Sequence, residues 1–258
     1  MSAVARYLRA QGWEVRGYDR SPSPLTQTLQ EEGIAIDYAK PTVSWTKEEA
    51  LVVYTPAIHP SDPVFTYFQS RGFTILKRSE ILGRLTAEKT ALCVAGTHGK
   101  TTTSAMIAHI LSLTEQGTNA FLGGISNQVH SNLMIRASSP LVVVEADEYD
   151  RSFYHLQPAM SVITAIDPDH LDIYGTAEQY QAAFDHYATL VSDAIVLNER
   201  YTLHGDLQAR VYTYSASSET AAFRAENTRV DNGEIYFDWV YPAGRMEQVR
   251  LGVPAPVN

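Results

Sequence analysis

The stretch that most constrains the fold runs from Ala91 to Thr103 and reads Ala-Leu-Cys-Val-Ala-Gly-Thr-His-Gly-Lys-Thr-Thr-Thr. An apolar run too short for a helix leads into a turn bracketed by Gly96 and Gly99, and residues 104–113 then follow a helical pattern. Strand, glycine turn, Lys with a hydroxyl, and helix is the order of a phosphate-binding loop. The sequence therefore predicts an α/β fold with a nucleotide phosphate bound at this turn.

Each residue type in the turn has a chemical reason. Glycine lets backbone N–H groups approach phosphate oxygens, and the start of the next helix offers further unpaired N–H groups. Lys100 adds a positive charge, and the Thr101 hydroxyl can bind the Mg²⁺ that accompanies a nucleotide. Val94 stands where the general pattern has a glycine. The alternative, an ordinary strand-to-helix turn, leaves the Thr triplet at 101–103 unexplained, because Thr is a mediocre helix former.

Length and charge set the broad class. A chain of 258 residues can hold two domains. The net charge of −9 argues against nucleic acid as a partner, since backbone phosphates require a basic face. No window approaches the ~20 apolar residues of a membrane span, and the start shows no signal-peptide pattern. The single cysteine, Cys93, is expected to be a small buried hydrophobe. We expect a cytoplasmic protein.

Residues 1–85 form the first predicted unit. Helices are predicted at 2–11, 24–32 and 63–71, and they alternate with strands at 13–18, 34–38, 51–55 and 73–76. This alternation predicts a Rossmann-like parallel sheet. Such a unit normally opens with a strand, so we expect the first strand to be missing by truncation. Asp19 follows the first predicted strand, where it either meets ribose hydroxyls or caps the turn before Ser21; both interpretations stay open.

Residues 86–258 form the second predicted unit. Further strands are predicted at 119–122, 141–144, 161–166, 194–197 and 211–214, with a helix from Thr176 to about residue 191. Alternating segments at 223–230, 234–240 and 246–251, with Asn232-Gly233 between the first two, predict an antiparallel extension of the sheet. Residues 253–258 have the composition of a linker, so we expect a further domain beyond this chain.

Two strands of the second unit end in polar groups, where α/β proteins collect functional side chains. Glu145 is the first charge after the apolar run 141–144, which is the place of a second Mg²⁺ anchor in phosphate-loop enzymes. Asp147, Glu148 and Asp150 are predicted to be solvated loop charges. His170 follows the strand at 161–166 and is a candidate metal or phosphate ligand. His98 either binds a substrate oxygen or hydrogen-bonds its own loop.

Three motifs together resemble the Mur ligase family. They are Gly-Thr-His-Gly-Lys-Thr-Thr-Thr at 96–103, Val-Glu-Ala-Asp-Glu-Tyr-Asp-Arg-Ser-Phe at 144–153, and Ile-Asp-Pro-Asp-His-Leu-Asp-Ile-Tyr at 166–174. The resemblance is strongest to the members that join L-alanine to UDP-N-acetylmuramate. It implies three domains: one for the UDP-substrate, a central ATPase and a C-terminal domain. This chain resembles the first two, and the missing parts imply that it does not complete a catalytic cycle alone.

The resemblance also implies roles for individual residues. The residues implied to bind the ATP phosphates are Gly96, Thr97, His98, Gly99, Lys100, Thr101 and Thr102. The implied Mg²⁺ ligands are Thr101, Glu145 and His170, and the implied catalytic residues are Lys100, Glu145 and His170. The residues implied to bind the UDP-sugar are Asp19, Thr55, Ala57, His98, Gly123 and Gly124. The implied reaction transfers the ATP γ-phosphate to the lactyl carboxylate of UDP-N-acetylmuramate, and the amine of L-alanine then displaces phosphate.

Three alternatives stay open. One is the recycling ligase that joins a ready-made tripeptide to the same UDP-sugar and shares the first two motifs. The second is a nucleotide- or UDP-sugar-binding module without turnover, which is what the missing ends suggest for the chain as it stands. A small-molecule phosphate-loop kinase is disfavoured, because it leaves residues 1–85 without a purpose.

Overall fold

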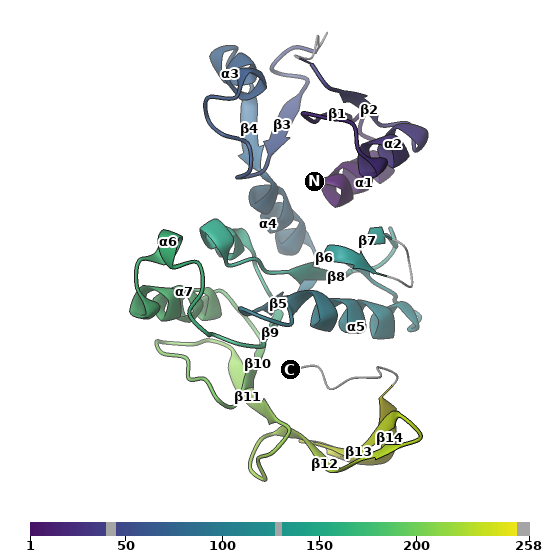
Figure 1. The fold of residues 1–258 in the computed structure, drawn as a ribbon, viewed down its shortest axis with the longest axis vertical. Helices are drawn as coiled ribbons and strands as arrows, with labels where there is room; N and C mark the ends of the chain where they lie inside the picture. The colour runs from purple at the N-terminus through teal and green to yellow at the C-terminus, as the bar shows by residue number, and fades with distance from the viewer. Residues whose placement is uncertain (40–44, 127–130, 252–258) are drawn as a thin grey trace.

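The structure is a computed structural model that describes residues 1–39, 45–126 and 131–251. The linker-like segment 253–258 lies outside these residues. Figure 1 shows three parts along the long axis. Residues 1–77 lie at one end, a large sheet with its helices lies in the middle, and three antiparallel strands lie at the other end.

The first part alternates helices and strands as predicted: α1 (Ser2–Ala10), β1 (Arg16–Tyr18), α2 (Pro24–Glu31), β2 (Ala35–Asp37), β3 (Leu51–Tyr54), α3 (Pro63–Ser70) and β4 (Thr74–Lys77). The Ser23 hydroxyl caps α2 and the Asp62 carboxylate caps α3, with a proline in the first turn of each helix. Pairing is parallel, as expected. Within the described residues, however, β1–β2 and β3–β4 form two separate sheets instead of the single sheet predicted.

The middle part is organised around β5 (Thr90–Ala95), which α4 (Arg78–Glu88) precedes. Its neighbours in the ten-stranded sheet are β8 (Leu141–Glu145) and β9 (Met160–Ile163), both parallel to it. The remaining strands of this part are β6 (Asn119–Ser126), β7 (Ser131–Met134), β10 (Ala194–Asn198) and β11 (Arg210–Ser215). β5 is apolar from Ala91 to Ala95, and all of this run except the partly buried Leu92 is buried, as a strand covered on both faces should be.

The helices of the middle part are α5 (Lys100–Ser112), the 3₁₀ segment η1 (Tyr149–His155), α6 (Leu171–Tyr174) and α7 (Ala177–Thr189). Thr176 caps α7 by accepting a hydrogen bond from Gln179 N, as its position before the helix predicts. Aromatic rings from η1 and α7 fill the core, with Phe153 stacked on Tyr187. Cys93 is buried there, and burial raises the pKa of its thiol to about 12, so it behaves as a hydrophobe.

The antiparallel extension is confirmed as β12 (Phe223–Asp231), β13 (Glu234–Tyr241) and β14 (Gly244–Leu251). β12 pairs parallel with β11, so these strands continue the large sheet. The turn between β12 and β13 places Asn232 and Gly233 at φ 50° and 81°, the left-handed region that these residue types favour.

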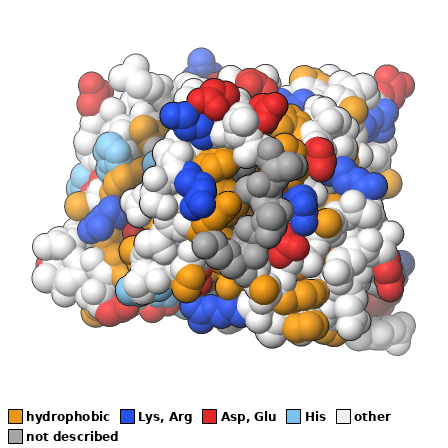
Figure 2. All heavy atoms as spheres, turned by 90° about the horizontal axis from the view of Figure 1, so that it is seen from above, with side chains coloured by type: hydrophobic (Ala, Val, Ile, Leu, Met, Phe, Trp, Pro, Cys, Tyr) orange, Lys and Arg blue, Asp and Glu red, His pale blue; other side chains and the backbone are white. Residues whose placement is uncertain are grey.

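Two further observations concern the helices and the charged side chains of the surface. In the described residues, no helix combines the length and apolar character needed to cross a bilayer. The end of the molecule formed by the first part carries Lys and Arg side chains interspersed with Asp and Glu (Figure 2).

Candidate active site

The phosphate-binding turn lies between β5 and α5, as the sequence predicts. Gly96 has φ 135°, and a Cβ there would sit 2.2 Å from Thr164 Oγ1. Gly99, at φ 81°, immediately precedes α5. A side chain at Gly96 is disfavoured by both the positive φ and this clash, and one at Gly99 by the positive φ alone. The N-terminus of α5 faces the turn, which leaves its first N–H groups available to an anion.

Lys100 is held by two acceptors. Its Nζ donates to Gly96 O at 2.6 Å and to Glu148 Oε1 at 2.8 Å. Glu148 is only 2% exposed, and its Oε2 receives no hydrogen bond in the described residues although Lys100 Nζ lies 2.8 Å away. Burial raises the pKa of Glu148, and Lys100 opposes that shift. The prediction of a solvated Glu148 is thus wrong: this carboxylate is buried and holds the loop lysine.

Glu145 connects the phosphate-binding turn to β6. Its Oε1 accepts a hydrogen bond from Thr101 Oγ1 at 3.1 Å, and its Oε2 accepts one from Gly123 N at 2.8 Å. A Cβ at Gly123 would lie 2.5 Å from the Glu145 carboxylate, and one at Gly124 would lie 3.3 Å from Thr101 Cγ2. The two glycines belong to β6 and not to a loop, and they let this strand approach the carboxylate and hydroxyl closely.

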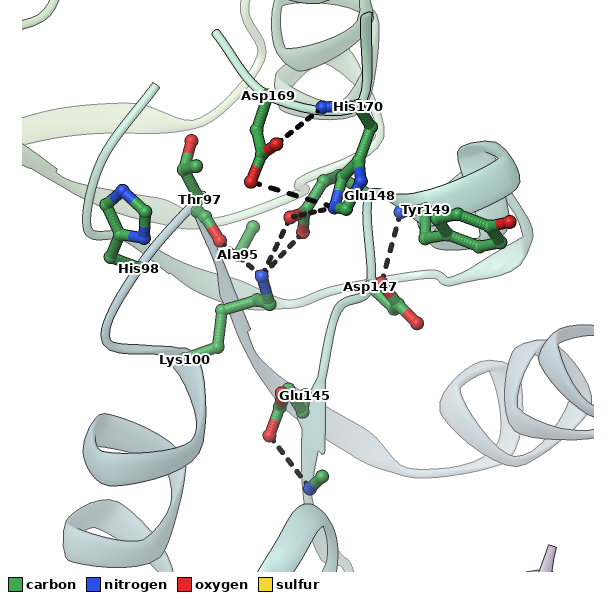
Figure 3. A network of polar contacts seen from close by, with 12 residues as sticks. Ala95, Thr97, His98, Lys100, Glu145, Asp147, Glu148, Tyr149, Asp169 and His170 are labelled. Atoms are coloured by element: carbon green, nitrogen blue, oxygen red, sulfur yellow. Dashed lines mark hydrogen bonds and ion pairs between the residues drawn. The ribbon is translucent and has the colours of Figure 1, made fainter. Parts of the chain in front are cut away.

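His170 faces Glu148. Its Nε2 lies 4.0 Å from Glu148 Oε1, and its ring packs edge-to-face on Tyr149 with centroids 5.4 Å apart. Figure 3 shows Lys100 and His170 pointing toward Glu148, while Glu145 points toward the backbone of Gly123. No contact joins Glu145 to His170 in the described residues, and no group of three or more His, Cys, Asp or Glu there is arranged to hold a metal ion.

A cavity of about 240 Å³ lies beside this group. One wall comes from the loop after β3 and the start of α4, and the other comes from the end of β8 and from η1. The lining residues are Thr55, Pro56, Ala57, Arg78, Ser79, Leu82, Glu145, Asp147, Tyr149, Ser152 and Leu156. An ion pair between Lys77 Nζ and Asp150 Oδ2, 2.7 Å long, also joins the two walls. Asp150 is thus paired and not simply solvated, whereas Asp147 is exposed as predicted.

The other predicted site residues lie apart from this cavity. Asp19 is exposed, and its Oδ1 accepts a hydrogen bond from Ser21 N at 3.4 Å, which is the turn contact considered as its alternative role. The His98 ring is exposed and makes no hydrogen bond in the described residues, while its carbonyl oxygen contacts Thr164 Oγ1. Thr97 Oγ1 donates to Asp167 O at 2.7 Å, which ties the turn to the segment after β9. Thr102 is exposed in the first turn of α5.

Comparison with known sequences now identifies the family. The pattern of the Mur ligase middle domain matches residues 94–258, and that of the Mur ligase family catalytic domain matches residues 1–90. The chain belongs to the Mur ligase family. All three motifs that carried the resemblance lie in the middle domain, and the structure gathers their side chains around Lys100.

Individual Mur ligases resemble the whole chain. A UDP-N-acetylmuramate–L-alanine ligase from Porphyromonas gingivalis is 47% identical over 267 residues, which cover 100% of this chain and 59% of the relative. The ligase of the same name from Phocaeicola vulgatus is 50% identical and is covered to 58%. The chain therefore spans under two thirds of the length of these relatives.

Solved Mur ligase structures have the same fold. UDP-N-acetylmuramate–alanine ligase from Thermotoga maritima superposes with a TM-score of 0.81 at 29% identity, covering 98% of this chain and 58% of that one. UDP-N-acetylmuramate:L-alanyl-gamma-D-glutamyl-meso-diaminopimelate ligase from Neisseria meningitides gives a TM-score of 0.85 over 98% of this chain and 84% of that one. Its identity is 22%, so the second likeness concerns the fold alone.

Sequence reasoning missed two residues of the site. Glu148 carried a readable signal, because burial continues to alternate after β8: Ala146 and Glu148 are buried and Asp147 is exposed. A period-two pattern extended past the strand end would have turned Glu148 inward. Ser79 carried no such signal, because it sits in the first turn of a helix where serine is common for other reasons.

Proposed function

We propose that this chain is the substrate- and ATP-binding part of a ligase that joins L-alanine to the lactyl carboxylate of UDP-N-acetylmuramate. The names of the relatives that match the whole chain support this substrate pair. The observation that carries the proposal is the position of Glu145. It contacts Thr101 of the phosphate-binding turn and also lines the cavity whose other wall holds Thr55 and Ala57. A phosphoryl donor and a sugar acceptor bound at these two places would meet.

We assign residues 1–85 to the UDP-sugar and residues 86–258 to ATP. In this division, the turn from Gly96 to Thr102 and the start of α5 bind the ATP phosphates. Thr55 and Ala57 line the sugar side of the cavity, where Thr55 Oγ1 already accepts a hydrogen bond from Ala57 N at 3.0 Å. Asp19 and His98 remain proposed sugar-binding residues.

The residues around Thr101 suit Mg²⁺. This ion prefers a small number of protein oxygen ligands together with phosphate and water oxygens. The Thr101 hydroxyl and the Glu145 carboxylate are such ligands, and they already lie 3.1 Å apart. His170, beside Glu148, stays the proposed ligand of a second ion. Bound Mg²⁺ would supply positive charge that lowers the repulsion between the phosphates and the acceptor carboxylate.

The chain's own residues carry the rest of the mechanism. Lys100 shifts from Glu148 and Gly96 O to the transferred phosphoryl group, whose negative charge it stabilises. Gly123 N fixes the Glu145 carboxylate, so that group is positioned before substrate arrives. The cavity walls hold the carboxylate in line with the phosphoryl group, and the amine of L-alanine then attacks the phosphorylated carboxyl carbon and releases phosphate.

Two measurements test the proposal. Calorimetry on this chain should detect binding of ATP in the presence of Mg²⁺ and of UDP-N-acetylmuramate. The natural gene product that contains this chain should release phosphate when L-alanine is supplied. Release with the tripeptide in place of L-alanine would identify the recycling ligase instead, and binding without turnover would leave a nucleotide-binding module. We further propose that the protein works in the cytoplasm, where both nucleotides are available.

A further inference from the structure

The start of α4 brings an unsatisfied polar group into the cavity. Ser79 is the second residue of this helix, is 8% exposed and lines the cavity. Its Oγ is buried and has no hydrogen-bond partner in the described residues. A buried hydroxyl without a partner costs free energy, and most such groups in native structures are paired. An unpaired hydroxyl in a cavity wall points to a ligand that supplies the missing partner.

Arg78 adds a charge at the same place. It is the first residue of α4, lines the cavity, and forms no hydrogen bond or ion pair in the part of the chain that the structure describes. By contrast, Arg6 is bound to Glu32 through two hydrogen bonds of 2.6 and 2.8 Å. An unpaired guanidinium in a partly enclosed site is suited to a carboxylate or phosphate.

The helix itself favours an anion. α4 spans 11 residues, and the N–H groups of its first turn have no partners within the helix. Together with the helix dipole, these groups attract negative charge to the N-terminus. Hydroxyl, guanidinium and helix N-terminus therefore converge on one wall of the cavity, and all three favour an oxyanion.

The opposite wall narrows the choice of oxyanion. It carries the carboxylates of Glu145 and Asp147, which repel a negative group and keep it on the α4 side. Glu145 also contacts Thr101 in the phosphate-binding turn, so an anion in this cavity lies next to the site of phosphoryl transfer. Of the two kinds of anionic group in UDP-N-acetylmuramate, the lactyl carboxylate is the one that must reach that site.

We propose that Arg78, Ser79 and the first turn of α4 form a subsite for the carboxylate arm of the sugar nucleotide. The proposal rests on the function proposed above and adds two substrate-contacting residues to it. Ser79 Oγ donates a hydrogen bond to one carboxylate oxygen, and Arg78 supplies the opposing charge. The subsite holds the carboxylate away from Glu145 and Asp147 until the phosphoryl donor is in place.

Binding measurements with two sugar nucleotides test the subsite. UDP-N-acetylglucosamine keeps the uridine diphosphate of UDP-N-acetylmuramate and lacks the lactyl carboxylate. We expect Ser79→Ala to weaken binding of UDP-N-acetylmuramate by about 10-fold and Arg78→Met by about 30-fold, as for hydrogen bonds to charged groups. Binding of UDP-N-acetylglucosamine should stay unchanged. Arg84→Met, at an exposed arginine of the same helix, is the matched control and should alter neither affinity.

Unfolding without ligand separates a binding role from a structural one. Because the Ser79 hydroxyl has no partner to lose, Ser79→Ala should leave the melting temperature unchanged or raise it. Ser139 provides the contrast: it is 1% exposed and its Oγ donates to Gly117 O at 3.0 Å, so Ser139→Ala should lower that temperature. A comparable loss from Ser79→Ala would mean that the hydroxyl serves the fold, which overturns the proposal.

The binding outcomes are distinguishable. Unchanged affinity for UDP-N-acetylmuramate in both α4 variants would overturn the subsite and leave the proposed function intact. An equal loss of affinity for both sugar nucleotides would show that the subsite binds the diphosphate, which overturns its assignment to the carboxylate. A wild-type chain that binds neither nucleotide would overturn the proposed function of this chain, and the subsite with it.

Discussion

The two parallel-strand regions of this molecule differ in how they are buried. In the middle part, the interior residues of β5 and β8 are nearly all buried, and the strands belong to one ten-stranded sheet. In the first part, β1 and β3 have no fully buried residue and belong to separate two-stranded sheets. Both regions alternate helices and strands, so the same local pattern supports very different amounts of core.

The difference matches the division of the site. Phosphoryl transfer needs fixed positions. Glu145 ends the well-buried strand β8, and Lys100 and Thr101 open α5 directly after the turn that follows the well-buried strand β5. The sugar side of the cavity is formed by the loop after β3 and by α4, where the surrounding strands are half-exposed. Regions with few buried apolar contacts open locally at lower cost. We therefore expect the sugar side to be the adjustable half of the site.

The largest expected effect on stability comes from the same change, phenylalanine to alanine, made in each region. Phe184→Ala removes a ring that is 0% exposed in the core of the middle part, and should cost about 3–5 kcal/mol of unfolding free energy. Phe68→Ala removes a half-buried ring of α3 that contacts Tyr67 and Phe73, and should cost about 1–2 kcal/mol. Urea unfolding of both variants measures the difference. Equal losses would mean that the two regions are equally well packed.

A second test addresses the buried ion pair of the middle part. Lys100→Met should weaken ATP binding by about 100-fold, because a charged contact to phosphate is lost. It should also cost about 2–3 kcal/mol of stability, because the buried Glu148 carboxylate loses the lysine that pairs with it. Adding Glu148→Gln should restore stability without restoring ATP affinity. Lys77→Met, at an ion pair that is one third exposed, is the control and should leave ATP binding unchanged.

The contrast between Glu145 and Glu148 shows what the sequence can predict. Glu145 ends an apolar strand, and its place at the edge of the sheet follows from that local pattern. The inward direction of Glu148 continues the alternation of β8, but its partner Lys100 lies 48 residues away, and no local pattern contains that pairing. The phosphate-binding turn, the order of elements and the antiparallel extension were likewise local and predictable. The two separate sheets of the first part and the unpaired Ser79 hydroxyl depend on packing between distant segments.

A smaller test concerns the ion pair that joins the two walls. Lys77 and Asp150 are about one third exposed, so Asp150→Asn should cost only about 0.5 kcal/mol. The cost should shrink further in high salt, because exposed pairs are screened. Thermal unfolding at low and high ionic strength measures both effects. A loss of several kcal/mol that salt does not alter would show that the two regions are joined more rigidly than their exposure indicates.

The antiparallel strands extend the comparison, because they too are largely exposed yet contain a polar network. Asp238 in β13 accepts hydrogen bonds from Gln248 N at 2.8 Å, from Asn227 Nδ2 at 2.7 Å and from Arg245 at 2.6 Å. These contacts lower the pKa of Asp238 from 3.8 to about 2, with the bond from Gln248 N as the largest cause. Asn227 and Gln248 stand at φ 51° and 53°, beside register shifts in both ladders.

The sign of the pH effect follows from this lowered pKa. The folded state prefers the ionised carboxylate, so the stabilisation is complete above the unfolded value of 3.8 and is lost as pH falls toward about 2. Asp238→Asn should lower the melting temperature at neutral pH, and its difference from wild type should shrink across that window. Asp231→Asn, at the exposed last residue of β12, is the matched control. If the difference in melting temperature between Asp238→Asn and wild type stays constant down to pH 2, the substitution disturbs packing and not charge. The exposed strands would then depend on packing, as β5 does.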